Sequence, residues 1–411
     1  MKKTVRDCDI KGKRLLMRVD FNVPLDAQGH ITDDTRIRET LPTIEYCTNQ
    51  QARVILLSHL GRPDGKRVPK YSLKPVAERL SQLLHQPVEF ADDCLGPSVE
   101  RLVDALPNGR VLLLENVRFY PDEEANNTDF AKALSRFGDL YVNDAFGTAH
   151  RAHATTEGLG HLLPAVAGFL MEKEIRYLDE ALKHPARPFV AILGGAKVSD
   201  KIGVLTRLLE KVDRILIGGG MSYTFLKAQG QAIGSSKLEA DKVDLAKDIL
   251  AKAQARNVQV LLPVDHVITT SLDPGTPTKV VPVGHIPDGW GGADIGPETI
   301  ARFTAALADA KTVVWNGPVG VFEQARFLEG SRRIAETLAN LKGATTIIGG
   351  GDSAACVQQL GLAKKMSHIS TGGGASLEYL EGKTLPGIAV LQDLTTCVSR
   401  QHPADSSCGL S

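Results

Sequence analysis

Short apolar runs recur along the whole chain, and each is followed by a polar or glycine-rich turn and a longer amphipathic stretch. In the first half the runs lie at 14–19, 53–58, 110–115 and 140–142. In the second half they lie at 189–193, 214–217, 258–264, 312–315 and 345–349. Runs of this kind are typical of strands buried on both faces of a parallel sheet. The amphipathic stretches between them, such as 72–85 and 241–255, carry helical patterns. The alternation predicts an α/β fold of doubly wound, mainly parallel sheets.

One helical segment stands apart from this alternation, at 171–188. Its apolar residues share one helical stripe, which holds Met171, Ile175, Leu178 and Leu182. Pro185 and Pro188 are expected to end the helix. Because 411 residues are enough for two domains, we interpret this segment as a helix that joins two lobes.

The composition is that of a globular protein, with 43% hydrophobic and 23% charged residues. Lys plus Arg and Asp plus Glu both number 48, so the net charge indicates neither nucleic acid nor a membrane surface as a partner. The six cysteines are scattered without a CxxC pair, which predicts reduced thiols in a cytosolic protein rather than a zinc site or a disulfide framework. We expect no signal peptide at the N-terminus, and the apolar stretch at 162–171 is too short to span a bilayer.

Polar side chains, most of them cationic, follow the apolar runs of the first half. They are Asp20, Asn22, His59, Arg62, Arg118, His150, Arg151 and His153, with Arg36 a little after the first run. Ligands of open parallel sheets bind beyond the carboxyl ends of the strands, and arginine captures carboxylate or phosphate in a bidentate manner. A single such arginine is most simply a surface ion pair, but their repetition at successive strand ends predicts an anion site. A metal site at His150 and His153 would need a third ligand, and none is evident.

Glycine clusters follow the apolar runs of the second half instead, at 194–195, 218–220, 349–351 and 372–374. We expect each cluster to open a helix, whose N-terminus and backbone N–H groups would face an anion. Glycines used only for tight packing are the alternative. The chain lacks both GxxxxGK[ST] and a GxGxxG after a strand, so it is not a P-loop protein, and a dinucleotide dehydrogenase is disfavoured.

Charged residues near these clusters suggest specific roles. Lys197 and Lys201 are expected to share one helix face, with Lys197 reaching a transferring phosphoryl group and Lys201 the nucleotide phosphates. Asp352 is either a helix N-cap or a Mg²⁺ ligand, and Glu323 could accept hydrogen bonds from ribose hydroxyls. Two solvated lysines are the alternative for Lys197 and Lys201.

Several long strings resemble one family. RVDFNVP, SHLGRP, LLLENVRFYPDEEAN, NDAFGTAHRAHAT, LGGAKVSDKI, GGGMSYTFLK, WNGPVGVFE, GGGDSA and STGGGASLE occur in the order found in phosphoglycerate kinases, over residues 1–391. The resemblance implies a cytoplasmic monomer of two Rossmann-like lobes joined by an interdomain helix. It implies that residues 1–170 bind 3-phosphoglycerate or 1,3-bisphosphoglycerate, that 171–188 form the hinge, and that 189–385 bind ADP or ATP with Mg²⁺. It also implies that the segment 386–411 returns towards the first lobe.

The resemblance assigns roles residue by residue. The residues implied for phosphoglycerate are Asp20, Asn22, Arg36, His59, Leu60, Gly61, Arg62, Arg118 and Arg151. Those implied for nucleotide or Mg²⁺ are Lys201, Asn316, Glu323, Gly350, Gly351, Asp352 and Ser353, with Asp352 as the metal ligand. Those implied for the transferring phosphoryl group are Arg36, Lys197 and Gly373.

The implied reaction needs no general base, because its acceptor in the reverse direction is a carboxylate that is already ionised at neutral pH. Catalysis would then consist of in-line alignment and charge stabilisation after the lobes close. A dehydrogenase and a non-catalytic anion-binding protein are the rival classes.

The polar tail with Cys397 and Cys408 departs from the family pattern. We expect its last dozen residues to be poorly ordered, with a redox role for its thiols as the alternative.

Overall fold

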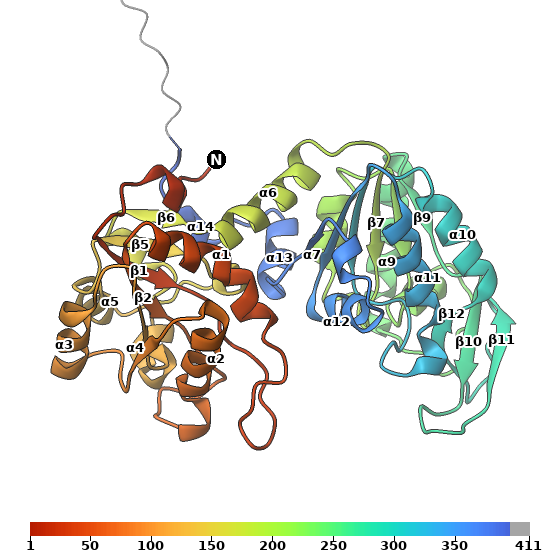
Figure 1. Cartoon of the computed structure of the whole chain (residues 1–411). Helices are drawn as coiled ribbons and strands as arrows, with labels where there is room; N and C mark the ends of the chain where they lie inside the picture. Colours follow the sequence, from red (N-terminus) through yellow and green to blue (C-terminus); the bar gives the residue numbers. More distant parts are fainter. Residues whose placement is uncertain (395–411) are drawn as a thin grey trace, which may run out of the picture.

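The computed structural model describes residues 1–394, which form two α/β lobes with separate sheets (Figure 1). The first sheet has six strands, all parallel, in the order β3-β4-β2-β1-β5-β6. These strands are β1 (Arg14–Arg18), β2 (Arg53–Leu57), β3 (Val88–Ala91), β4 (Val111–Leu114), β5 (Leu140–Asn143) and β6 (Ala165–Ala167).

Helices cover both faces of this sheet. They are α1 (Thr35–Asn49), α2 (Lys74–Leu84), α3 (Pro97–Ala105), α4 (Pro121–Glu124) and α5 (Thr128–Ser135). Successive strand residues point to opposite faces, so Leu15 packs in one core cluster with Ile44 of α1, while Leu16 packs in another with Leu134 of α5. This alternation explains why the strands read as continuous apolar runs.

The second lobe repeats the plan with six parallel strands in the order β15-β14-β13-β7-β8-β9. The strands are β7 (Phe189–Leu193), β8 (Arg214–Ile217), β9 (Gln259–Leu261), β13 (Thr312–Asn316), β14 (Thr345–Gly349) and β15 (His368–Ile369). Its helices are α7 (Ile202–Leu208), α8 (Ser222–Ala228), α9 (Val243–Ala255), α10 (Pro297–Leu307), α11 (Glu329–Asn340), α12 (Gly351–Gln359) and α13 (Gly374–Leu380). The predicted fold class of two doubly wound parallel sheets is confirmed.

A third, antiparallel sheet was not predicted from the sequence. It has the order β11-β10-β12, with β10 (Asp265–Thr269), β11 (Thr278–Pro282) and β12 (Gly291–Ile295). The residues of β11 are largely exposed, and β12 begins with two glycines, so neither strand has an apolar pattern that marks it. This sheet forms the outer end of the second lobe (Figure 1).

A single helix, α6 (Phe169–Lys183), connects the lobes, and α13 lies beside it (Figure 1). It starts earlier and ends earlier than the expected 171–188. Met171, Leu178 and Leu182 of the expected stripe are buried, whereas Ile175 is only partly buried. The buried carboxylate of Glu174 accepts hydrogen bonds from the backbone N–H of Thr371 at 2.7 Å and from its hydroxyl at 3.0 Å. The helix is thus tied to the turn that precedes α13.

The described chain ends beside its own beginning. After α14 (Pro386–Ala389), the backbone N–H of Gln392 donates to the carbonyl of Ala165 in β6, and Lys3 N–H donates to the carbonyl of Gln392. The segment 386–394 therefore lies against the first lobe. The expectations for the tail, including Cys397 and Cys408, lie outside the described residues.

Candidate active site

The loops after β1 and β2 are joined by polar contacts. Asp20 follows β1, and its carboxylate accepts a 2.6 Å hydrogen bond from Arg36 in the first turn of α1. Asn22 accepts a 2.8 Å hydrogen bond from the backbone N–H of Gly61. The carbonyl of the buried Leu60 accepts one from Asn116 at 2.8 Å. These contacts hold the two loops at one edge of the sheet, as the strand-end argument predicted.

Four cationic side chains, which lie at or after the ends of three different strands, act on the buried imidazole of His59. Burial lowers its pKa well below the usual value, and the charges of Arg18, Arg118, Arg36 and Arg151 lower it further. Burial also lowers the pKa of Arg118 to about 10, which still leaves its guanidinium charged at neutral pH. The result is a concentration of positive charge around a neutral imidazole, which is suited to an anionic ligand.

Arg18 is a member of this cluster that the sequence argument missed. It is fully buried at the end of β1 and donates to Thr155 Oγ1 at 2.8 Å and to His59 Nδ1 at 3.1 Å. Since arginine can only donate, Nδ1 of His59 accepts and the proton of the neutral ring lies on Nε2. A charged residue inside an apolar run was the available signal, because arginine is almost never fully buried unless it is paired.

The remaining cations of this edge differ in exposure. Arg62 is exposed on its loop, whereas Arg151 is half-buried and donates to His150 at 3.3 Å. Burial lowers the pKa of His153 to about 4, so that its ring is neutral. Among residues 1–394, no three His, Cys, Asp or Glu side chains gather as ligands for a metal ion.

The glycine turns of the second lobe pack closely against one another. A Cβ on Gly219 would lie 2.8 Å from the backbone nitrogen of Gly195, and one on Gly194 would overlap the carbonyl oxygen of Pro318. Gly195, Gly219 and Gly317 also have positive φ angles of 100°, 65° and 96°. Tight packing therefore explains part of the glycine content, while the same packing leaves the turns open towards a cavity.

The prediction that Lys197 and Lys201 share a helix face is wrong. Helix α7 begins only at Ile202, and Lys197 is exposed in an irregular segment. The carboxylate of Glu239 holds this segment, because it accepts hydrogen bonds from Val198 N–H at 2.5 Å and from the Ser199 hydroxyl at 2.5 Å. This partner lies far along the chain, so local spacing could not reveal it.

Lys201 and Asn316 form the buried part of the second-lobe site. The ammonium of Lys201 donates to Asn316 Oδ1, and burial lowers the pKa of the lysine. The amide nitrogen of Asn316 is buried without a partner among the described residues. Ser353 accepts a 2.6 Å hydrogen bond from Gly317 N–H, which joins the end of β13 to the first turn of α12.

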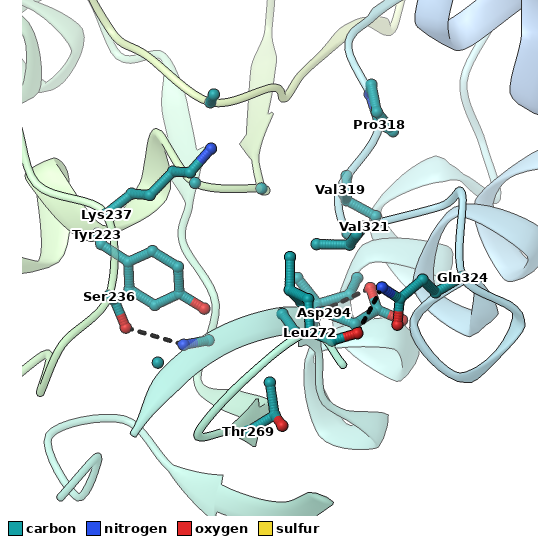
Figure 2. A pocket seen from close by; sticks show the side chains of 18 of the residues that line it. Tyr223, Ser236, Lys237, Thr269, Leu272, Asp294, Pro318, Val319, Val321 and Gln324 are labelled. Atoms are coloured by element: carbon teal, nitrogen blue, oxygen red, sulfur yellow. Dashed lines mark hydrogen bonds between the residues drawn. The ribbon is translucent and has the colours of Figure 1, made fainter. Parts of the chain in front are cut away.

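A cavity of about 650 Å³ opens in front of these turns (Figure 2). Its lining includes Glu323, Asp352, Tyr223, Ser236 and Lys237, with glycines from three turns. A cavity of this size can hold a small-molecule ligand such as a nucleotide.

Asp352 lies in the first turn of α12, whose N-cap residue is Gly350, with φ of 88°, so the N-cap interpretation of Asp352 is wrong. Its exposed carboxylate makes no hydrogen bond or ion pair with another described residue. Mg²⁺ commonly takes one or two protein carboxylates together with substrate phosphates. One unpaired carboxylate at the mouth of a nucleotide-sized cavity fits that requirement.

A second cavity, of about 480 Å³, is lined by residues of both lobes. Arg36 and Lys173 contribute from one side, and Gly351, Thr371 and Gly373 from the other. Gly373 precedes α13 with φ of 49°. The structure therefore brings Arg36 and Gly373 to one space, whereas Lys197 is not part of its lining.

Comparisons with known proteins identify the family. A family model described as phosphoglycerate kinase matches residues 5–383. A cytosolic phosphoglycerate kinase of Nicotiana tabacum is 60% identical over 393 residues, which cover 95% of this chain and 98% of that protein. The chain belongs to the phosphoglycerate kinase family. It is thus a kinase, a phosphotransferase enzyme. A phosphoglycerate kinase of Synechococcus elongatus is 59% identical over 94% of this chain and 96% of that protein.

Solved structures of the family share the fold. The phosphoglycerate kinase of Coxiella burnetii superposes with a TM-score of 0.87 at 42% identity, over 95% of this chain and 98% of that one. The enzyme of Pyrococcus horikoshii gives 0.79 at 32% identity, with the same coverage of both chains. Within residues 1–394, no helix has the length and apolar character to span a membrane.

Proposed function

We propose that the chain transfers the acyl phosphate of 1,3-bisphosphoglycerate to Mg-ADP, reversibly, giving 3-phosphoglycerate and Mg-ATP. The observation that carries this proposal is the cavity between the lobes, where Arg36 from the cationic edge meets Gly373 and the start of α12 from the glycine-rich edge. A phosphoryl group passing between ligands on the two edges would cross this space.

The first lobe supplies the binding site for phosphoglycerate in this proposal. His59, Arg62, Arg118 and Arg151 offer donors to its phosphate and carboxylate, and Asp20 with Asn22 fixes the loops that carry them. His59 is held neutral with its proton on Nε2, so it donates a hydrogen bond instead of acting as a base at neutral pH. The lack of a poised base agrees with a reaction whose acceptor is already ionised.

The transfer step is an in-line displacement at phosphorus. A terminal oxygen of ADP forms the new P–O bond while the bond to the acyl oxygen breaks and a carboxylate leaves. Arg36, Lys197 and the backbone N–H groups near Gly373 would stabilise the charge on the three equatorial oxygens. No proton needs to move in this step.

The second lobe holds the nucleotide in the larger cavity. We assign Lys201, Asn316, Gly350, Gly351 and Ser353 to the nucleotide phosphates, and Glu323, which lines the cavity, to the ribose. Asp352 would hold Mg²⁺, which, when bound, neutralises charge on the nucleotide phosphates. The buried unpaired amide nitrogen of Asn316 is a donor available to a phosphate oxygen.

The proposal extends to the setting of the enzyme. We place it in the cytoplasm as a monomer, in glycolysis, gluconeogenesis or carbon fixation. The concentrations of substrates and products set the net direction of the reversible reaction. The names of its relatives include both cytosolic and chloroplastic forms. A coupled assay that follows NADH oxidation during ATP-dependent phosphorylation of 3-phosphoglycerate tests the activity. Activity that requires both 3-phosphoglycerate and Mg²⁺ is expected, and its absence from pure, folded protein would refute the proposal.

A further inference from the structure

Lys237 is a cation of the larger cavity to which none of the motifs above gives a role. It lies between α8 and α9 and lines the cavity together with Ser236 and Tyr223. Figure 2 shows its side chain extending into the open space, with the nitrogen pointing away from Ser236 and Tyr223.

The stem of Lys237 packs against the glycine turns. Its Cδ lies 3.2 Å from the position that a Cβ on Gly220 would take, and the Ala196 carbonyl oxygen lies 3.0 Å from the same point. Near the same turn, Cε of Lys201 lies 4.0 Å from the position of a Cβ on Gly195. The turn at Gly195 and Ala196 therefore lies close to two lysines.

The backbone that carries Lys237 is anchored on both sides. Ser235 N–H donates to the carbonyl of Trp290 at 2.8 Å, and Ser236 Oγ accepts from Gly292 N–H at 2.9 Å. On the other side, Glu239 N–H donates to Thr224 Oγ1 at 3.3 Å. The antiparallel sheet and α8 thus fix the place of Lys237 although its side chain is exposed.

The ammonium of Lys237 has no hydrogen bond or ion pair within residues 1–394. The nearby carboxylate of Glu239 is already engaged by the 198–199 segment, and Asp241 pairs with Lys242 at 3.0 Å. An exposed lysine is ordinarily a solvated surface group. Here the fixed backbone, the packed stem and the cavity together direct an unpaired cation to the place where a nucleotide would lie.

We propose that Lys237 binds a phosphate oxygen of the nucleotide. This inference rests on the proposed nucleotide role of the cavity. Lys237 lines the same cavity as Asp352, the proposed Mg²⁺ ligand, and its stem packs on the glycine turn at Gly220, which also lines it. The lysine ammonium is a compact point charge suited to a phosphate oxygen.

Calorimetric titration with ADP and adenosine tests this assignment. Lys237→Met keeps most of the stem and removes the charge, so the dissociation constant of ADP should rise by about five- to tenfold. Adenosine binding should change by less than about twofold, because adenosine has no phosphate for the ammonium to contact. Lys237→Arg should restore most of the loss. Lys242→Met, which removes a neighbouring lysine that is paired with Asp241, should leave the binding of both ligands unaffected.

Two results would overturn the assignment. One is unchanged ADP binding in the Met variant. The other is an equal loss for adenosine and ADP, which would mean that the stem packs on the nucleoside and the charge has no contact. Thermal melting should show no loss of stability in the Met variant, since the side chain is exposed. In the kinase assay, the KM for nucleotide should rise with little change in kcat. A native chain that binds no ADP would refute the nucleotide role itself, which is a different result.

Discussion

Arg36 is held by a single carboxylate and otherwise faces the space between the lobes. Its 2.6 Å bond to Asp20 orients the guanidinium, while part of the side chain stays exposed in the smaller cavity. An arginine in this position can stabilise charge on a transferring phosphoryl group without contributing to nucleotide binding in the other lobe.

We therefore expect Arg36→Ala to lower kcat by on the order of 10³-fold or more, as for arginines in comparable roles. The KM for ATP should change little, because the nucleotide cavity contains no contribution from Arg36. Steady-state kinetics in the coupled assay measures both constants. Arg38→Ala is a matched control, since Arg38 lies on the same helix and pairs with Asp34 instead. A near-normal kcat in the Arg36 variant would refute the assigned role.

Asp144 gives a prediction about pH at the same scale. It is fully buried after β5, accepts a 3.0 Å hydrogen bond from Met171 N–H at the start of α6, and burial raises its pKa to about 7 from 3.8. Between these two values the folded protein binds more protons than the unfolded chain, so this carboxyl makes stability fall as pH rises.

Asp144→Asn removes this titration. Relative to the native chain, the variant should gain stability by up to about 1.4 kcal/mol per pH unit as pH rises from about 4 to 7. Urea unfolding at several pH values in this range measures the difference. Asp309→Asn is the control, because a hydrogen bond from Arg214 lowers the pKa of Asp309, which stays ionised across the window. A difference that does not depend on pH would contradict the prediction.

At the scale of elements, α6 does more than connect the lobes. The buried carboxylate of Glu174 also contacts Nε2 of His368 at 2.8 Å, and the ring of Tyr177 stacks on that of His368 at 4.7 Å. The helix therefore contacts β15 and the turn before α13, which contains Gly373. A movement of α6 can be transmitted through these contacts to the turn at Gly373.

Glu174→Gln should weaken these contacts, because its N–H₂ either faces the N–H of Thr371, which is itself a donor, or requires Nε2 of His368 to be the unprotonated nitrogen of the ring. We expect a loss of about 1–3 kcal/mol of stability and a lower kcat, measured by chemical unfolding and by the kinase assay. Glu172→Gln is the control, since Glu172 lies two residues away on the same helix and pairs with Arg6 at the surface. This substitution should change the free energy of unfolding by no more than about 0.5 kcal/mol. Equal effects of the two substitutions would argue against a special role for the buried contact.

At the scale of the whole molecule, each proposed ligand site belongs mainly to one lobe, and the cavity of about 480 Å³ is lined by residues of both lobes. Under the proposed function, separate sites would keep two phosphate-bearing ligands apart until both are bound. Transfer would then require the lobes to approach, and closure would also exclude the water that hydrolyses an acyl phosphate.

Small-angle scattering should therefore show a smaller radius of gyration with 3-phosphoglycerate and a non-hydrolysable Mg-ATP analogue together than with either ligand alone. The single-ligand samples are the controls, because they saturate one lobe only. An unchanged radius with both ligands bound would count against closure about α6.

The amino-acid sequence by itself determined most strands of both parallel sheets, because a strand buried on two faces must be apolar throughout, as 189–193 is. The edge strands β3, β6 and β15 were not among the predicted runs. It also determined the contrast between cations in the first half and glycines in the second, together with the family. Tertiary structure decided what depends on distant partners. Glu239 holds the loop that carries Lys197, and contacts with Thr155 and His59 place the buried Arg18 in the cationic cluster of the first lobe. The exposed strand β11 of the small antiparallel sheet is defined by its pairing alone, and a strand of the same sheet, β12, holds the backbone beside Lys237. Periodicity reports only on neighbours along the chain, so contacts of this kind become visible only once the chain has folded.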